Sequence, residues 1–163
     1  MIVVLFGVAG SGKTTLGQIL ASELGWSFYD ADEFHSPENI DKMHGGAPLT
    51  DADREPWLQR VRGLIERCLA TNENAVIACS ALKRTYRERL CLTSEVRFVY
   101  LRGTPQLIAA RLKARRGHFM ESDMSETQFA TLEEPGSDEE TITIDIAHPP
   151  HALIGEIKQK LSL

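Results

Sequence analysis

The feature that most constrains this chain is a glycine-rich loop close to its start. Residues Gly7 to Thr14 read G-V-A-G-S-G-K-T, which fits the phosphate-binding pattern G-x-x-x-x-G-K-T. The apolar run Ile2-Val3-Val4-Leu5-Phe6 before it predicts a buried parallel strand, and the residues from Thr15 onward predict an amphipathic helix. Because strand, loop and helix stand in the order that the motif requires, a chance match in a glycine-rich turn is the weaker alternative.

Such a loop binds phosphate through its backbone. Glycines let successive amides turn inward, and the N-terminus of the following helix adds partial positive charge. Lys13 is expected along the β- and γ-phosphates, and the Thr14 hydroxyl is expected to hold Mg²⁺. We therefore expect ATP and Mg²⁺ as cofactors. The expected ATP-binding residues of the loop are Gly7, Val8, Ala9, Gly10, Ser11, Gly12, Lys13, Thr14 and Thr15.

Length and composition exclude several classes of protein. At 163 residues the chain is long enough for one domain, residues 1–163, with a full core. Its net charge of -5 and pI near 5.5 give no reason to expect nucleic acid or an anionic membrane as a partner. No apolar run is long enough to span a bilayer, so we expect a cytoplasmic protein. The three cysteines share no metal-ligand spacing and are expected to be reduced core thiols.

Strands and helices are expected to alternate along the whole chain. This pattern predicts an α/β fold of the P-loop NTPase type, with three α/β/α layers, a five-stranded parallel sheet and a mobile lid at about 116–130. After the first strand, further strands are expected at 26–29, 75–79, 96–101 and 141–146. Helices are expected from Ser36 to about Gly45, from the Thr50 capping box to about Cys68, at 82–90, from Thr104 to about Arg116, at 126–132 and from about Pro150.

Two carboxylates follow the second expected strand. Asp30 and Asp32 are two residues apart, so on an extended segment both side chains face one side. Ligands of such folds gather at the carboxyl ends of the strands, close to the phosphate loop. Asp32 could therefore accept the proton of an acceptor hydroxyl, and Asp30 could bind Mg²⁺ through water or orient Lys13. The alternative is an ordinary strand-end turn, in which aspartate is common.

A basic cluster near residue 115 could meet the transferred phosphoryl group. Arg111 and Arg115 are four residues apart and are expected to share one helix face, so we assign both to the nucleotide and Arg115 also to catalysis. Their alternative role is that of a solvated helix end, and Arg116 is assigned to the surface. The glycine and polar residues that follow suit a hinged lid that excludes water.

Further cations suggest a positive pocket for an anionic acceptor. The candidates have ordinary alternatives: His35 could cap a helix, Arg54 could pair with Asp51, and Lys83 and Arg84 could be solvated charges. His118 is assigned to the lid, whereas His148 and His151 flank two prolines and are interpreted as structural.

Long ordered sequence blocks resemble those of the gluconate kinases (gluconokinases), small P-loop kinases related to shikimate and adenylate kinases. The resemblance covers nearly the whole chain. The blocks are G-V-A-G-S-G-K-T from Gly7, D-A-D-E-F-H from Asp30, N-I-D-K-M from Asn39, G-x-P-L-T-D-x-D-R-x-P-W-L from Gly46, C-S-A-L-K-R-x-Y-R from Cys79, F-V-Y-L from Phe98, R-L-K-A-R-R-G-H-F-M from Arg111 and Q-F-x-x-L-E-x-P from Gln128.

The resemblance implies transfer of the γ-phosphoryl group of ATP to the C6 hydroxyl of D-gluconate, with 6-phosphogluconate and ADP as products. It places Asp32 against the acceptor hydroxyl and implies a homodimer. It also implies that the acceptor site is faced by His35, Arg54, Lys83, Arg84 and His118. Two alternatives remain: a sister kinase acting on shikimate or a nucleoside monophosphate, and a nucleotide-dependent switch. Against the switch, no Asn-Lys-x-Asp segment that would read guanine occurs.

Overall fold

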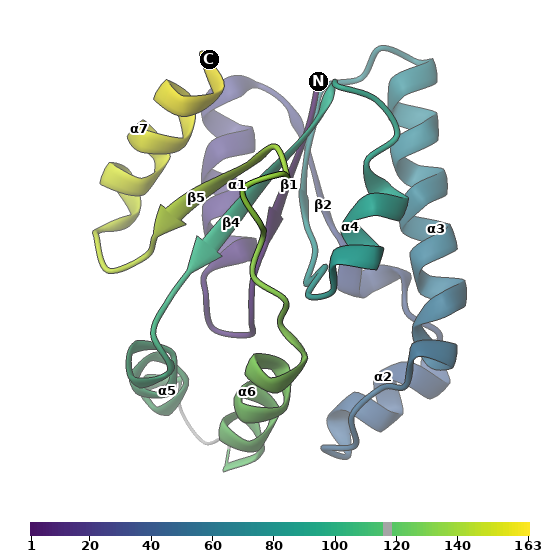
Figure 1. Cartoon of the computed structure of the whole chain (residues 1–163), viewed down its shortest axis with the longest axis vertical. Helices are drawn as coiled ribbons and strands as arrows, with labels where there is room; N and C mark the ends of the chain where they lie inside the picture. Colours follow the sequence, from purple (N-terminus) through teal and green to yellow (C-terminus); the bar gives the residue numbers. More distant parts are fainter. Residues whose placement is uncertain (116–118) are drawn as a thin grey trace.

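A five-stranded parallel sheet forms the centre of the molecule, as the sequence predicts (Figure 1). The computed structural model describes residues 1–115 and 119–163, and only the backbone of residues 119–124. The strand order is β2-β3-β1-β4-β5, so the strand before the phosphate loop lies in the middle. The strands are β1 (Ile2–Phe6), β2 (Ser27–Asp30), β3 (Ala75–Ala78), β4 (Val96–Arg102) and β5 (Thr141–Asp145).

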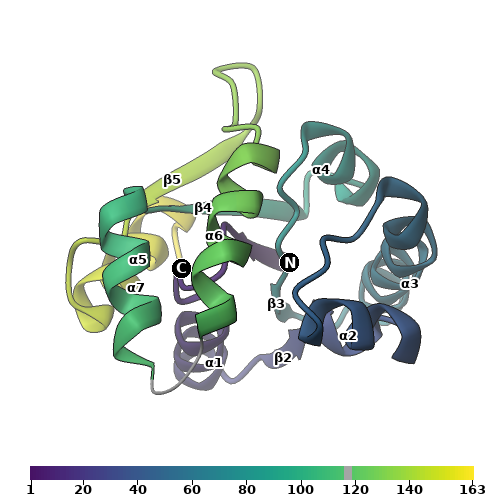
Figure 2. The ribbon, with the colours of Figure 1, turned by 90° about the horizontal axis from the view of Figure 1, so that it is seen from below.

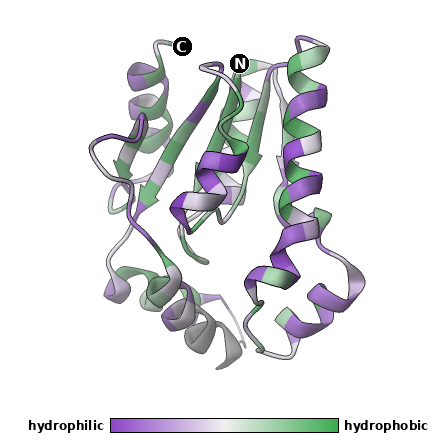
Figure 3. Cartoon of the chain, turned by 45° about the vertical axis from the view of Figure 1, so that its right-hand side comes forward, coloured by the Kyte–Doolittle hydropathy of each residue, from purple (hydrophilic) through white to green (hydrophobic). Residues whose placement is uncertain are grey.

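Helices cover both faces of this sheet and give the three expected layers. Side chains of β1 alternate between the two cores: Val4 and Phe6 contact one cluster, and Val3 and Leu5 contact the other. The first cluster is built with α3 (Asp51–Ala70) and α4 (Arg84–Leu90). The second is built with α1 (Lys13–Leu24), α5 (Pro105–Ala114) and α7 (Pro150–Leu161). Figure 3 shows the hydrophobic strands inside and hydrophilic stripes on the outer side of the helices.

The remaining elements lie beyond the carboxyl ends of the strands. They are η1, a 3₁₀ turn (Ala31–Phe34), α2 (Pro37–His44) and α6 (Phe119–Thr131). Seen from that end, α6 and α2 stand on either side of the strand ends, whereas both chain termini lie at the opposite end of the sheet (Figures 1 and 2). This arrangement leaves the carboxyl edge of the sheet, where the phosphate loop begins, flanked by two separate helices.

Several local predictions were wrong. Asp32 lies in η1 and not on an extended segment, because Asp30 caps that turn by accepting a hydrogen bond from the Asp32 backbone N–H at 3.0 Å. Helix α5 ends at Ala114, so Arg115 is extended and does not share a helix face with Arg111. The helix predicted at 126–132 begins at Phe119 and ends at Thr131, and the one predicted from residue 82 begins at Arg84. Cys68 and Cys79 are buried as expected, but Cys91 is exposed.

The predicted helix starts after β2 are confirmed. Ser36 caps α2, with Pro37 in its first turn, and Thr50 and Asp53 form a reciprocal capping box at the start of α3. Within residues 1–115 and 119–163, the helices lack the combination of length and apolar character that a membrane span needs.

Candidate active site

The phosphate loop has the backbone geometry that its glycines predict. Gly10 and Gly12 have φ of 81° and 92°, a region that residues with a Cβ rarely adopt. The Lys13 ammonium folds back over the loop and donates hydrogen bonds to the carbonyls of Gly7 at 2.9 Å and Val8 at 3.0 Å. The loop is therefore preformed, and its lysine is held by backbone carbonyls of the loop itself.

A cleft of about 240 Å³ opens at the carboxyl edge of the sheet, between the loop, η1, α3 and α6. Lys13 and Asp32 both line it, and each shifts the pKa of the other. The structure thus brings the expected phosphate-binding and proton-accepting groups into one space. The predicted site residues that line this cleft are Ala9, Gly10, Gly12, Lys13, Thr14, Asp30, Asp32, His35, Arg54 and Arg115.

Burial shapes the protonation of the groups around Lys13. It lowers the pKa of the Lys13 ammonium, an effect that the neighbouring Asp32 carboxylate opposes. Asp32 is open to the cleft, yet the surrounding protein reduces its solvation and raises the pKa of its carboxyl, while Lys13 acts in the other direction. A carboxylate with a raised pKa is a better proton acceptor than an ordinary aspartate. Burial raises the pKa of the Cys79 thiol to about 12, so Cys79 adds no charge here.

Two side-chain oxygens of the kind that Mg²⁺ prefers lie together at the carboxyl end of β2. The Thr14 hydroxyl donates a hydrogen bond to Asp30 Oδ2 at 2.9 Å, and both residues line the cleft. Mg²⁺ prefers such oxygen ligands and usually takes one or two from the protein, with the rest from phosphates and water. Among the described residues, no cluster of three or more His, Cys, Asp or Glu could hold a metal ion. The Thr14–Asp30 pair therefore fits a magnesium ion that is bound jointly with a nucleotide.

His35 differs from the expectation of a cationic acceptor residue. Its ring stacks on the Trp57 indole, with centroids 4.6 Å apart, and the indole N–H donates to the Ala31 carbonyl at 2.7 Å. Burial, with the nearby Arg54 and Arg60, lowers the pKa of His35 to about 4. The imidazole is consequently neutral at physiological pH. His35 lines the cleft as a flat polar surface and not as a positive charge.

The acceptor-side cations are arranged unequally. Arg54 lines the cleft, and within the described part of the chain the polar contacts of its guanidinium are long, 3.4 Å to the Tyr86 hydroxyl and 4.0 Å to Asp51. Lys83 donates to both Asp51 oxygens at 2.9 Å, which raises the pKa of Lys83, and Tyr86 also donates to Asp51. Among the described acceptor candidates, His35 and Arg54 line the cleft, whereas Lys83 is already paired with a carboxylate outside its lining.

Arg84 does not line the cleft and takes part in an ionic network at the molecular surface. Its guanidinium contacts Glu88 at 2.8 Å and Asp138 at 2.7 Å. Its buried neighbour on this helix, Arg87, pairs with Glu139 at 2.7 Å and donates to the carbonyls of Ala81 and Leu82 at 3.1 Å. Arg87 thereby holds the loop after β3, whose Leu82 lines the cleft.

A second cleft of about 280 Å³ lies on the other side of the phosphate loop. Gly10, Gly12 and Arg115 line both clefts, so the loop separates two adjoining spaces. Arg111 lines only the second, and its guanidinium donates to the Ile146 carbonyl at 2.6 Å. The other residues lining this cleft are Ser11, Thr15, Leu16, Ala114, His148, Pro150 and Leu153.

Sequence reasoning missed some residues of these clefts. His148, interpreted as structural, lines the second cleft, and Trp57 and Gln128 line the first. The Gln128 side-chain carbonyl accepts a hydrogen bond from the Ala9 backbone N–H at 2.6 Å. The sequence contained a signal for Gln128, since it begins the last resembling block, but its role depends on a contact across 119 residues. His118 and Arg116, and so part of the predicted lid at 116–130, lie outside the described residues.

A preformed phosphate loop between two clefts, on a five-stranded parallel sheet, defines the class of small P-loop kinases. The sequence profile of the shikimate kinase family matches residues 9–161. A probable gluconokinase from Xenopus tropicalis is 41% identical, over 97% of this chain and 92% of that protein. The chain belongs to the shikimate kinase family and, within it, to the gluconokinases.

Solved structures agree with this assignment. A sugar kinase from Janibacter sp. HTCC2649 superimposes with a TM-score of 0.92 at 43% identity, covering 99% of this chain and 94% of that one. A gluconokinase from Sinorhizobium meliloti 1021 superimposes with a TM-score of 0.83 at 40% identity, covering 98% and 94%.

Proposed function

We propose that this protein transfers the γ-phosphoryl group of ATP to the C6 hydroxyl of D-gluconate, giving 6-phospho-D-gluconate and ADP. The observation that carries the proposal is that Lys13, Asp32 and Arg54 line one cleft. The gluconokinases to which the chain is 40% identical or more supply the identity of the acceptor.

The two clefts divide the nucleotide between them. We assign the second cleft, between α5 and the loop before α7, to the nucleoside, because it adjoins the outer side of the phosphate loop and offers Arg115 and Pro150 as flat walls. The phosphate chain then passes over Gly10 and Gly12, which line both spaces, and its terminal phosphoryl group enters the first cleft. Arg115 lines both clefts and can neutralise charge that develops during transfer.

On the acceptor side, Asp32 accepts the proton of the attacking hydroxyl as the new O–P bond forms and the bond from the γ-phosphorus to the β,γ-bridging oxygen breaks, which releases ADP. Its raised pKa suits that role, and Lys13 beside it stabilises both the carboxylate and the phosphates. We assign the gluconate carboxylate to Arg54, whose polar contacts with the described residues are long, and the polyol chain of gluconate to the neutral surface of His35, which stacks on Trp57. Lys83 and Arg84 contribute little to acceptor binding in this proposal, since both are paired with carboxylates.

We further propose that Thr14 and Asp30 hold Mg²⁺ together with the nucleotide, Thr14 through its hydroxyl and Asp30 directly or through water. When bound, the ion supplies positive charge to the β- and γ-phosphates. The family resemblance also leads us to propose a homodimer, and we keep the cytoplasmic location expected from the sequence as a proposal. Light scattering of the purified protein would test the oligomeric state.

A panel of acceptors tests the central proposal. ADP release should be fast with gluconate and ATP, and slow with glucose, because glucose lacks the carboxylate that Arg54 would bind. Shikimate and nucleoside monophosphates should also be poor acceptors. Turnover with one of these and none with gluconate would overturn the proposal, and nucleotide binding without transfer to any acceptor would favour a switch protein.

A further inference from the structure

The phosphate loop is not bare in this structure, because a side chain from α6 is bonded to it. The Ala9 backbone N–H donates to Gln128 Oε1 at 2.6 Å, which is short for an N–H to oxygen bond. The amides of such loops are the groups that bind phosphate oxygens. An amide oxygen of the protein therefore occupies a position next to the loop where a phosphate oxygen would be expected.

The position of Ala9 indicates which phosphate that would be. Ala9 and Lys13 line the first cleft only, together with Asp32, whereas Ser11 and Thr15 line only the second. The part of the polyphosphate nearest to Ala9 is thus the part nearest to the acceptor, which is its terminal phosphoryl group. A nucleoside diphosphate, one phosphoryl group shorter, would leave this amide uncovered.

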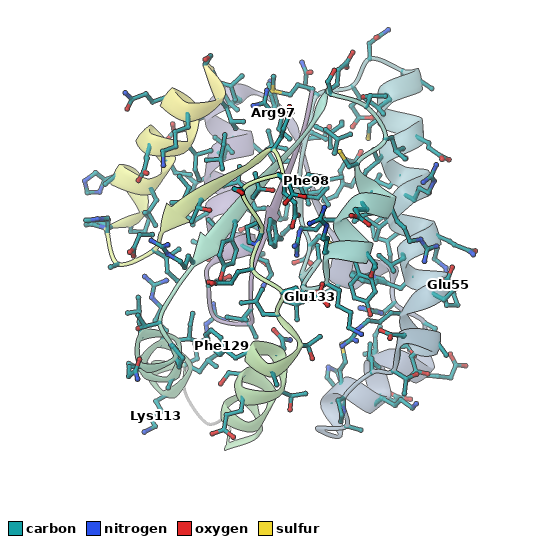
Figure 4. All side chains as sticks on the ribbon, in the orientation of Figure 1. Glu55, Arg97, Phe98, Lys113, Phe129 and Glu133 are labelled. Carbon is teal, nitrogen blue, oxygen red and sulfur yellow. The ribbon has the colours of Figure 1, made fainter. Side chains whose placement is uncertain are left out.

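Gln128 is held at this place by the packing of its own helix. Phe129, on α6, packs against the core cluster formed with α1, α5 and α7 (Figure 4). Just beyond the helix, Glu133 (Figure 4) makes two hydrogen bonds to the segment that leads from β3 into α4. Its N–H donates to the Leu82 carbonyl at 2.9 Å, and its carboxylate accepts from the Arg84 N–H at 2.8 Å. The end of α6 that carries Gln128 is therefore fixed both to the core cluster formed with α1, α5 and α7 and to the loop after β3.

From these contacts we propose that Gln128 discriminates nucleoside triphosphate from diphosphate, because its side-chain oxygen competes with a γ-phosphoryl oxygen for the Ala9 amide. The proposal rests on the assignment of the clefts to ATP given above. In the ligand-free and ADP-bound protein the Gln128–Ala9 bond closes and joins α6 to the loop. When ATP binds, this bond breaks and a γ-phosphoryl oxygen accepts the hydrogen bond from the Ala9 N–H. ATP binding therefore requires the loss of one hydrogen bond within the protein, whereas ADP binding does not.

Calorimetric titration separates this role from simple packing. The ligands are ADP and adenylyl imidodiphosphate, a non-hydrolysable ATP analogue, each with excess Mg²⁺, and the readout is the ratio of their dissociation constants. Gln128→Ala removes the competing oxygen, so the analogue should bind about fivefold tighter while ADP affinity stays unchanged. Gln128→Glu places a negative charge beside the terminal phosphoryl group, so the analogue should bind at least about tenfold weaker relative to ADP.

A matched control isolates the local effect. Ala130 lies on the same helix, is exposed and does not line either cleft, so Ala130→Glu adds the same charge and should leave the ratio unchanged. Equal shifts in Gln128→Glu and Ala130→Glu would overturn the proposal, as would a Gln128→Ala protein in which both ligands weaken equally or the analogue weakens more. A wild-type protein that binds neither ligand would instead overturn the assignment of the clefts.

Nuclear magnetic resonance gives a second measurement at the bond itself. The Ala9 amide resonance should move in the ligand-free Gln128→Ala protein and coincide with the wild-type resonance once the ATP analogue is bound. An Ala9 resonance that is the same in the two ligand-free proteins would show that the bond is absent in solution and would overturn the inference.

Discussion

The phosphate loop and the acceptor side of the same cleft are built in different ways. The loop is one continuous stretch, and the bonds of its lysine go to backbone carbonyls of Gly7 and Val8 within it. The acceptor side gathers His35, Arg54 and the loop after β3 from separate segments, and those segments carry carboxylates that neutralise part of their positive charge. The chemistry of a local motif can thus be predicted from the sequence. The charge of a pocket assembled from distant segments depends on which cations form ion pairs with carboxylates in the folded chain.

The largest expected effect lies at the point where the two sides meet. Asp32→Asn keeps the size of the side chain but removes the proton acceptor, so transfer to gluconate should fall by about 10² to 10⁴-fold. ATP affinity should be retained, because the loop is intact. A coupled ADP-release assay with calorimetry measures both quantities. Near-normal turnover would show that Asp32 is not the base and would contradict the proposal that the phosphate loop and the acceptor side meet at this carboxylate.

The next effect distinguishes the cations of the acceptor side. Arg54→Met keeps the apolar stem but removes the charge, and we expect KM for gluconate to rise by about 10- to 100-fold, because a carboxylate would lose its charged partner. The matched variant Arg84→Met should change KM by less than about twofold, since Arg84 is exposed and paired with Asp138 and Glu88. The reverse order would show that the sequence-based assignment of Arg84 to the acceptor was right and the static pairing misleading.

A smaller effect concerns pH. At pH 7 His35 is neutral in the folded chain and mostly neutral in the unfolded chain. As the pH falls below 6.5 the unfolded chain binds a proton that the folded chain binds only near pH 4, so the free energy of unfolding decreases across this window. From pH 7 to pH 5 the contribution of His35 to this loss should be about 1 to 2 kcal/mol, so the His35→Gln protein should lose less stability than the wild type by about that amount.

Urea unfolding at the two pH values measures that difference. His151→Gln, at an exposed position remote from Trp57 in sequence, serves as the control and should retain the wild-type loss. If His35→Gln loses as much stability as the wild type, the imidazole is not held neutral by its burial, and the acceptor side is more positive than the structure indicates.

The smallest effect tests how the acceptor side is supported. Thr50→Ala removes half of the capping box at the start of α3 and should lower the free energy of unfolding by about 1 kcal/mol. Because Arg54 lies in the first turns of α3, KM for gluconate should rise slightly while KM for ATP stays constant. Thr71→Ala, at the other end of α3, should affect neither KM. A change in KM for ATP alone would contradict the separation of the two sides.

The sequence by itself determined the strand–loop–helix unit, the alternation that makes a parallel sheet, and the helix starts at Ser36, Thr50 and Thr104, because each depends on neighbours within a few residues. It also placed Asp30 and Asp32 correctly at the carboxyl edge of the sheet. The extended segment on which both side chains were predicted to face one side is replaced by the turn η1.

Only the tertiary structure decided which charged groups face the cleft. Lys83 and Arg84 carry the same formal charge as Arg54 in the sequence, but carboxylates of Asp51 and of Asp138, 32 and 54 residues away along the chain, neutralise them. Burial against Trp57 likewise makes His35 neutral, and Gln128 reaches Ala9 across 119 residues. Hydrogen bonding, ion pairing and desolvation act through space, so a side chain's charge and partner follow from the packing of segments that sequence order leaves far apart.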